Sequence, residues 1–399
     1  MLTRFKELDS LRGLAALSVL IEHLLIVIPV VDASTWGQKK YNWLNYIKYT
    51  PLHVFWAGDE AVIFFFVLSG FVLSLPFYSS PPSYLQFIIK RVCRIYIPYI
   101  AAIALGFLAL EVSYHGPITG LSPWFNTIWS LPITAKTFID HILLIGPLQV
   151  NAVDPPIWSL RQEMRISLVF PLIMILIERL KWVWSLMFGI ALTVLSFRHG
   201  MHTPPGTFNY LLYFIMGSLL AKHRFSLSLL IDKRRRLLRI VLAICAVLLY
   251  TFRWWTFGFQ ALRIPILDYC IVSIGVCIFI ILTVSTTPKW LLVKPIQFLG
   301  RISYSLYLIH MIIITSLIHT LSGLIPLWII LILAFFISIC SAFIGYYLIE
   351  LPSINLGRNW VKRISNRQQV LVSPYVDVAP THKDPHFTPE KAHQINRHD

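Results

Sequence analysis

Two polar side chains that could do chemistry lie inside an apolar stretch near the start of the chain. Arg12 and His23 are eleven residues apart in the segment DSLRGLAALSVLIEH, which runs from Asp9 to His23. At about 100° per residue, eleven helical steps return to within roughly 20° of the same direction, so both side chains share one face. A rise of about 1.5 Å per residue separates them by roughly 16 Å. This spacing predicts a cation near one membrane interface and an imidazole near the bilayer midplane.

His23 has two interpretations at this point. It could be a histidine of an anchor helix that is hydrogen-bonded to a neighbouring helix. Glu22 lies beside it and adds a further ionisable group to the same span. Several ionisable groups in one span are costly and usually mark a functional site. We therefore favour the functional interpretation of His23.

The composition is that of a polytopic membrane protein. Of the 399 residues, 57% are hydrophobic and only 13% are charged, whereas about a quarter of a soluble chain is charged. The first apolar run is longer than that of a signal peptide and no small-residue cleavage site follows it, so we expect a retained span. The five cysteines lie in or beside apolar runs without C-x-x-C spacing. They are interpreted as small core residues, and no metal site is expected.

Apolar segments of spanning length predict an all-α transmembrane bundle of about ten spans. They fall at 13–31, 59–78, 95–112, 158–177, 183–199, 207–221, 240–257, 265–285, 299–319 and 326–349. We expect a membrane domain at 1–352 and a disordered cytoplasmic tail at 353–399. His141 to Leu148 is apolar but too short to cross, and is expected at the interface.

The lysines and arginines predict that both termini are cytoplasmic. With the N-terminus inside, and without the tail, 16 basic residues fall in inner segments and 7 in outer segments, which favours this orientation in the plasma (inner) membrane. The net charge of +16 is then largely a property of the cytoplasmic face. It could attract anionic lipid, or a polyanionic cytosolic ligand such as a nucleotide-bearing cofactor. No basic soluble module for nucleic acid is present.

The longest outer segment, from Ser113 to Ile157, is rich in Pro, Gly and Trp. Its tryptophans could form an interfacial belt. They could also stack on sugar rings. The sequence leaves both possibilities open.

Further polar residues interrupt the second and third spans. Ser69 and Gly70 follow a run of phenylalanines and form a small-residue patch that lets helices approach closely. Arg91 and Arg94 are three residues apart, so they share a helical face at the cytosolic border. They could snorkel towards the interface, or they could clamp a phosphate or carboxylate.

The fourth and ninth spans carry polar stripes. Glu163 lies in WSLRQE and could pair with Arg161, Arg165 or a residue of another helix. The segment RISYSLYLIH begins at Arg301 and ends at His310, with hydroxyl groups that include those of Ser303 and Tyr304. Together these stripes predict a polar cavity inside the bundle.

The ordered set of motifs resembles the membrane-bound acyltransferase 3 family, which O-acylates bacterial surface glycans. The resemblance covers about residues 5–352. It rests on D-x-x-R-G followed after ten residues by His23, FFFVLSGF at 64–71, KRVCRIYIP at 90–98, WSLRQE at 158–163, RISYSLYLIH at 301–310 and IELP at 349–352. Each motif alone is weak, but the series in this order is specific.

The resemblance implies an integral membrane O-acyltransferase. His23 would be the catalytic group, either as general base on an acceptor hydroxyl or as the carrier of a covalent acyl group. Arg12 would contact the acyl donor or orient the site, and Arg91 and Arg94 would hold the phosphates of acyl-CoA.

Other residues would line the cavity or position the acceptor, namely Asp9, Ser69, Glu163, Arg301, Ser303, Tyr304 and His310. The donor would be cytosolic acyl-CoA, most simply acetyl-CoA, with no permanently bound cofactor. The acceptor would be a carbohydrate such as an exopolysaccharide, O-antigen, peptidoglycan or lipid-linked saccharide.

This chain departs from the family pattern at two places. Glu22 directly precedes His23, and Arg161, Met164 and Arg165 replace the surroundings usual after W-S-L. These differences bear on the choice of acceptor. The polar residues after the membrane part are too few for the esterase-like domain of some members, so we expect a stand-alone form.

Two other classes of function fit some of these features. A transporter or proton-coupled carrier would also use His and Glu near the midplane. A non-catalytic membrane scaffold would tolerate loss of His23.

Overall fold

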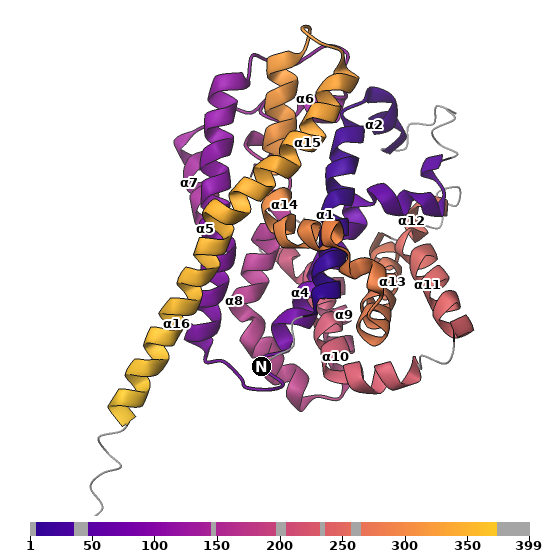
Figure 1. Cartoon of the computed structure of the whole chain (residues 1–399), viewed down its shortest axis with the longest axis vertical. Helices are drawn as coiled ribbons and strands as arrows, with labels where there is room; N and C mark the ends of the chain where they lie inside the picture. The colour runs from indigo at the N-terminus through magenta and orange to yellow at the C-terminus, as the bar shows by residue number, and fades with distance from the viewer. Residues whose placement is uncertain are drawn as a thin grey trace, which may run out of the picture.

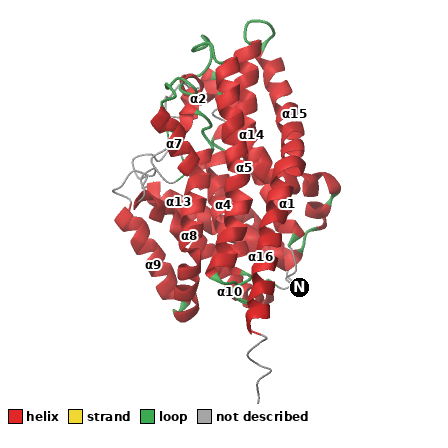
Figure 2. Ribbon diagram, turned by 90° about the vertical axis from the view of Figure 1, so that its left-hand side faces the viewer, coloured by secondary structure: helices red, strands yellow, loops and turns green. Residues whose placement is uncertain are grey.

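The computed structural model describes residues 5–35, 47–144, 149–196, 205–231, 236–256 and 265–372. Within these ranges the chain forms helices, turns and loops, and no strand (Figure 2). The predicted all-α class is confirmed.

The helices follow one another along the whole described chain. The α-helices are α1 Lys6–Ile26, α2 Pro29–Thr35, α4 Gly58–Ser74, α5 Tyr84–Ser113, α6 Pro123–Asn126, α7 Ala135–Leu143, α8 Ile157–Arg179, α9 Trp182–Ser196, α10 Phe208–Leu230, α11 Arg236–Tyr250, α12 Phe252–Trp255, α13 Pro265–Thr286, α14 Lys294–Leu321, α15 Leu327–Gly345 and α16 Leu351–Val372. The short 3-10 turns are η1 Pro51–Trp56, η2 Val150–Ala152, η3 Pro205–Thr207 and η5 Lys289–Leu292, and η6 Tyr346–Glu350 is a π-helical turn.

A helix lies at each of the predicted spans. Four stretches of the described chain are long and apolar enough to cross a membrane, namely Tyr84–Ser113, Leu267–Thr286, Lys294–Leu321 and Leu327–Asn366. The count of about ten spans therefore stays a prediction. Residues 145–148, 197–199 and 257, which fall in predicted apolar segments, lie outside the described residues.

Helices α1 and α14 lie side by side at the centre of the bundle (Figure 1). Gly13 and Gly300 permit this contact, because a Cβ on Gly13 would collide with the Gly300 backbone. A Cβ on Gly300 would lie 2.5 Å from the Asp9 carbonyl oxygen. Small residues allow helix backbones to approach closely. The two glycines thus set the distance across which side chains of α1 and α14 meet.

A second glycine contact joins α4 and α10. A Cβ on Gly70 would collide with the backbone of Phe214, and one on Gly217 would collide with the backbone of Val67. The close approach predicted from Ser69 and Gly70 is therefore present. It orients Ser69 on the other side of α4, towards α8.

The chain after residue 352 is more ordered than predicted. Residues 351–372 form helix α16, which packs along α5. Gly357 lies against Cys93, and Gln86 donates a hydrogen bond of 3.1 Å to Ser365. The prediction of disorder directly after residue 352 was wrong for residues 353–372, because small and polar residues of α16 fit against α5. Residues 373–399 lie outside the described residues, and the division at 352 stays a prediction.

The first turn of α1 and the last turn of α16 lie at the same end of the molecule (Figure 1). Helices α2 and α6 lie at the opposite end. This arrangement agrees with an even number of crossings, although the side of the membrane on which each end lies stays a prediction.

All five cysteines are free. Cys93 is buried, as expected for a core residue, whereas Cys340 is exposed on α15. The expectation of core cysteines was thus wrong for Cys340. In an apolar helix such a side chain suits contact with lipid.

Candidate active site

His23 and His310 meet between α1 and α14. The Nδ1 atom of His23 lies 3.1 Å from Nε2 of His310, and the ring centroids are 5.0 Å apart. His310 is 1% exposed, while His23 is partly buried. The two histidines, 287 residues apart in sequence, form one pair inside the bundle.

Backbone carbonyls determine which ring nitrogens carry hydrogen. Nδ1 of His23 lies 2.9 Å from the Val19 carbonyl oxygen, and Nδ1 of His310 lies 2.9 Å from that of Leu306. Because a carbonyl oxygen only accepts, each Nδ1 is assigned the hydrogen. In the neutral pair, the single Nδ1–H of His23 is then shared between the Val19 carbonyl oxygen and Nε2 of His310, and Nε2 of His23 keeps its lone pair. This nitrogen makes no hydrogen bond with the described residues, so it can accept a proton.

An aromatic ring from the segment between α5 and α8 covers this pair. Trp124 of α6 stacks on His23 with ring centroids 5.6 Å apart and planes inclined by 30°. Its backbone N–H donates to Asp32, which attaches α6 to α2. Trp124 was expected in a belt or on a sugar ring, and the structure places it over the catalytic candidate.

Arg12 lies further along the same face of α1. Its guanidinium donates to Asp9 at 2.7 Å and to Ser303 of α14 at 3.1 Å. Arg12 and His23 therefore both contact α14, which confirms that they share one helical face. Arg12 keeps about a quarter of its side chain exposed, at 23%.

Glu163 joins three helices. It accepts a hydrogen bond of 2.7 Å from Arg91 of α5 and one of 3.1 Å from Ser69 of α4. Arg91 also donates to Ser167 at 3.1 Å and is 7% exposed. Of the partners left open by the sequence, the residue on another helix is the one found. Arg91 is therefore engaged in an ion pair. Its role in binding phosphate stays a prediction.

Arg94 lies one turn beyond Arg91 in a different environment. The positive charges of Arg94 and Arg12 both attract the carboxylate of Glu350 in the turn η6. Ser305 donates to Glu350 at 2.7 Å, and Tyr304 donates to the Ile95 carbonyl at 2.9 Å. Two arginines and one glutamate thus converge beside α14. Glu350 was not among the residues predicted to form the site, although the IELP motif contains it.

Arg301 differs from the other predicted site residues in its surroundings. Its side chain is exposed on α14, and it makes no hydrogen bond or ion pair with the part of the chain that the structure describes. It lies in the same helix as Ser303, at the end nearer the first turn of α1.

Helix α14 organises all these contacts. From Ser303 to His310, its polar side chains bond to α1, α5, the turn η6, α8 and again α1. Tyr307 supplies the contact with α8, through a hydrogen bond of 2.7 Å with Ser159. The sequence predicted this polar stripe but not the helix that each residue contacts.

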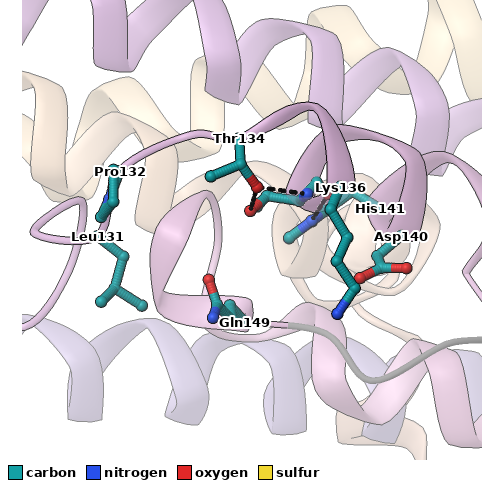
Figure 3. Close-up of a pocket in the computed structure, with 8 residues that line it drawn as sticks. Leu131, Pro132, Thr134, Lys136, Asp140, His141 and Gln149 are labelled. Atoms are coloured by element: carbon teal, nitrogen blue, oxygen red, sulfur yellow. Dashed lines mark hydrogen bonds between the residues drawn. The ribbon is translucent and has the colours of Figure 1, made fainter.

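A separate pocket opens among the segments that connect α5 to α8. Its volume is about 290 Å³, and it is lined by Leu131, Pro132, Thr134, Lys136, Thr137, Asp140, His141 and Gln149 (Figure 3). It contains none of the predicted site residues. Burial lowers the pKa of His141 in its wall, so this histidine favours the neutral form.

A buried carboxyl group lies beside the helical core. Asp154 precedes α8 and is 1% exposed, and neither carboxylate oxygen has a hydrogen-bond partner among the described residues. Burial raises the pKa of Asp154 well above its usual range. The neutral form is therefore favoured here.

The bundle and its polar stripe define a membrane-embedded helical protein with a pair of histidines and several arginines in its interior. The profile of the acyltransferase domain family matches residues 5–347. The chain belongs to the acyltransferase 3 family and is a membrane acyltransferase. No curated protein and no solved structure gives a significant match. The family match gives no support to the carrier hypothesis.

Proposed function

We propose that this protein transfers an acetyl group from acetyl-CoA to a hydroxyl group of a carbohydrate, with Nε2 of His23 as the general base. The observation that carries the proposal is the histidine pair. Both Nδ1 atoms face carbonyl oxygens, so His23 presents an unshared electron pair at Nε2. The unperturbed pKa of imidazole lies near neutral pH, which suits a base that must also return its proton.

The proposed reaction balances without a cofactor. Nε2 of His23 takes the proton of the acceptor hydroxyl while the oxygen attacks the thioester carbonyl carbon. The carbon–sulfur bond then breaks, and the proton passes from His23 to the CoA sulfur. The products are a carbohydrate ester and free CoA. A path in which His23 itself carries the acyl group uses the same nitrogen.

The arginines support a donor that carries phosphates. Arg12 and Arg94 converge near Glu350, and Arg301 is exposed nearby on α14. Guanidinium groups suit phosphate because they donate several hydrogen bonds in a fixed fork. In this proposal the CoA phosphates bind at the end where α1 begins, on the cytosolic side. Its thioester reaches along α1 towards His23.

The opposite end of the bundle has features that suit binding of the carbohydrate acceptor. The segments between α5 and α8 cover His23 with Trp124 and also contain the pocket whose lining includes Lys136 and Asp140. We place the carbohydrate at this end, outside the cytoplasm. Asp9, Ser69 and Glu163 then act mainly by holding the arginines and helices of the site in place.

The direct test measures CoA release by the purified protein in lipid nanodiscs. Wild-type protein is incubated with acetyl-CoA, with and without oligosaccharide acceptors, and free thiol and saccharide ester are quantified together. We expect both products in equal amounts, and loss of both in His23→Gln and Arg12→Ala. His319→Gln is the matched control, because His319 lies on α14 but stacks on Phe125 and Trp129 instead of His23.

Two results would contradict the proposal. One is thiol release and ester formation at the wild-type rate in His23→Gln. The other is net movement of an unmodified saccharide across a proteoliposome membrane without ester formation, which would favour a carrier. Acid quenching during turnover separates the two chemical paths, since only the covalent path leaves labelled acetyl on the protein.

A further inference from the structure

His310 has no chemical task in the transfer step above, yet it contacts the proposed base directly. Its Nε2 lies 3.1 Å from Nδ1 of His23, on the side of the ring opposite to the reacting nitrogen. The Val19 carbonyl, at 2.9 Å from the same Nδ1, already accounts for the position of the hydrogen. The role of His310 must therefore be something that this carbonyl alone does not supply.

The Val19 carbonyl belongs to the same helix as His23, four residues before it. Such a contact moves with α1 and does not hold the ring relative to the rest of the bundle. His310 belongs to α14 and is itself fixed by the Leu306 carbonyl. A hydrogen bond from His23 to His310 therefore fixes the imidazole ring relative to a second helix.

His310 also lies where positive charge develops. When Nε2 of His23 takes a proton, the ring becomes an imidazolium and its Nδ1–H becomes a stronger donor. Neutral His310 offers a lone pair to this hydrogen and is buried at 1% exposure, so water does not compete for it. A bond that strengthens as charge develops lowers the barrier to the transfer step.

We propose that His310 is a positioning residue for His23, an inference that rests on the proposed function. Its Nε2 accepts the Nδ1–H of His23, holds the ring so that Nε2 of His23 faces the acceptor hydroxyl, and stabilises the imidazolium formed during transfer. The hydrogen bond between Leu306 and His310 keeps His310 in the tautomer that can accept.

The kinetic test compares two substitutions of His310 in the full-length protein. His310→Leu removes the acceptor, and we expect kcat to fall about 100-fold with the KM for acetyl-CoA unchanged. His310→Gln retains an acceptor oxygen, and we expect it to recover most of the lost kcat. His319→Gln, the same chemical change nine residues later on α14, should leave kcat and KM as in wild type. A structural defect would instead lower the amount of folded protein in both His310 variants.

The spectroscopic test does not depend on activity. In nanodiscs containing 15N-histidine-labelled protein, nitrogen–nitrogen coupling across the hydrogen bond should connect His23 Nδ1 to His310 Nε2. The coupling should disappear in His310→Gln and persist in His319→Gln.

Absence of the coupling in wild type would overturn the pair, and wild-type kcat in His310→Leu would overturn its role. An inactive wild type that still shows the coupling would contradict the proposed function but leave the pairing established.

Discussion

At the scale of residues, one buried ion pair joins charged side chains of two different helices. Arg91 and Glu163 form an ion pair at 2.7 Å, with 8% and 18% of their side chains exposed. Removing one partner leaves the other charge buried and uncompensated, whereas removing both is much less costly. The pair therefore makes α5, α8 and α4 depend on one another at the site.

We predict that Glu163→Gln destabilises the protein by about 3 kcal/mol, because the Arg91 charge remains buried. The melting temperature in detergent measures the effect. The double variant Arg91→Met with Glu163→Gln should regain most of the loss. If the double variant is as unstable as the sum of the two single variants, the two charges do not stabilise each other.

Asp154 gives a prediction about pH. Burial raises its pKa, so the folded protein holds this proton more tightly than the unfolded chain. The associated stability is complete below the ordinary aspartate pKa of about 4 and is lost as pH rises through the raised value. Asp154→Asn cannot ionise and should therefore gain stability relative to wild type as pH rises.

Melting temperatures of wild type and Asp154→Asn at pH 5 and pH 8 check this prediction. We expect the advantage of the variant to be larger at pH 8. Glu111→Gln, which changes an exposed carboxylate on α5, serves as control. An advantage that shrinks as pH rises would show that Asp154 is ionised and has a charged partner.

At the scale of elements, α14 is the helix on which the site depends. Its polar side chains reach four other elements, but its register against α1 is set by backbone contact between Gly13 and Gly300. This contact places Ser303 beside Arg12 and His310 beside His23. Both pairs run in the same direction along the two helices, so α1 and α14 are parallel.

We predict that Gly13→Val separates α1 from α14 and abolishes acyl transfer, because the new side chain meets the backbone of α14. Thermal stability and ester formation should both decrease. Gly345→Ala is the matched control, since its Cβ would lie 3.8 Å from Ser305, an ordinary contact. Wild-type activity in Gly13→Val would show that the distance between these helices does not control the histidine pair.

At the scale of the whole molecule, the two ends of the bundle are formed by different helices. The first turn of α1 and the end of α16 lie together, while α2 and α6 lie at the far end (Figure 1). The excess of lysine and arginine predicts that the former end is cytoplasmic. This orientation decides where donor and acceptor enter.

Labelling of single cysteines in intact cells tests the orientation. In a background in which all five native cysteines are replaced by serine, a membrane-impermeant maleimide should label Ser130→Cys and should not label Asn359→Cys, because both positions are exposed but lie in opposite regions. Lysed cells provide the control, in which both should react. Labelling of Asn359→Cys alone in intact cells would reverse the orientation and the proposed direction of transfer.

Local spacing predicts much of this arrangement. Apolar runs indicate where helices lie, and the interval between Arg12 and His23 predicts that both face one neighbour. Partners across helices are not encoded in such intervals. The pairing of Arg91 with Glu163 and of His23 with His310 depends on which helices are adjacent, and only the fold shows this. The order of residues 353–372 was missed because their polar composition hides a surface that fits α5.

Transfer of isotope-labelled acetyl from acetyl-CoA to a saccharide by wild type and His23→Gln in nanodiscs tests whether His23 is the catalytic base. We predict labelled ester with wild type and a rate about 100-fold lower with His23→Gln, while His319→Gln keeps the wild-type rate. Binding of acetyl-CoA, measured separately, should persist in all three. Labelled ester formed by His23→Gln at the wild-type rate would contradict the assignment of His23 as the catalytic base.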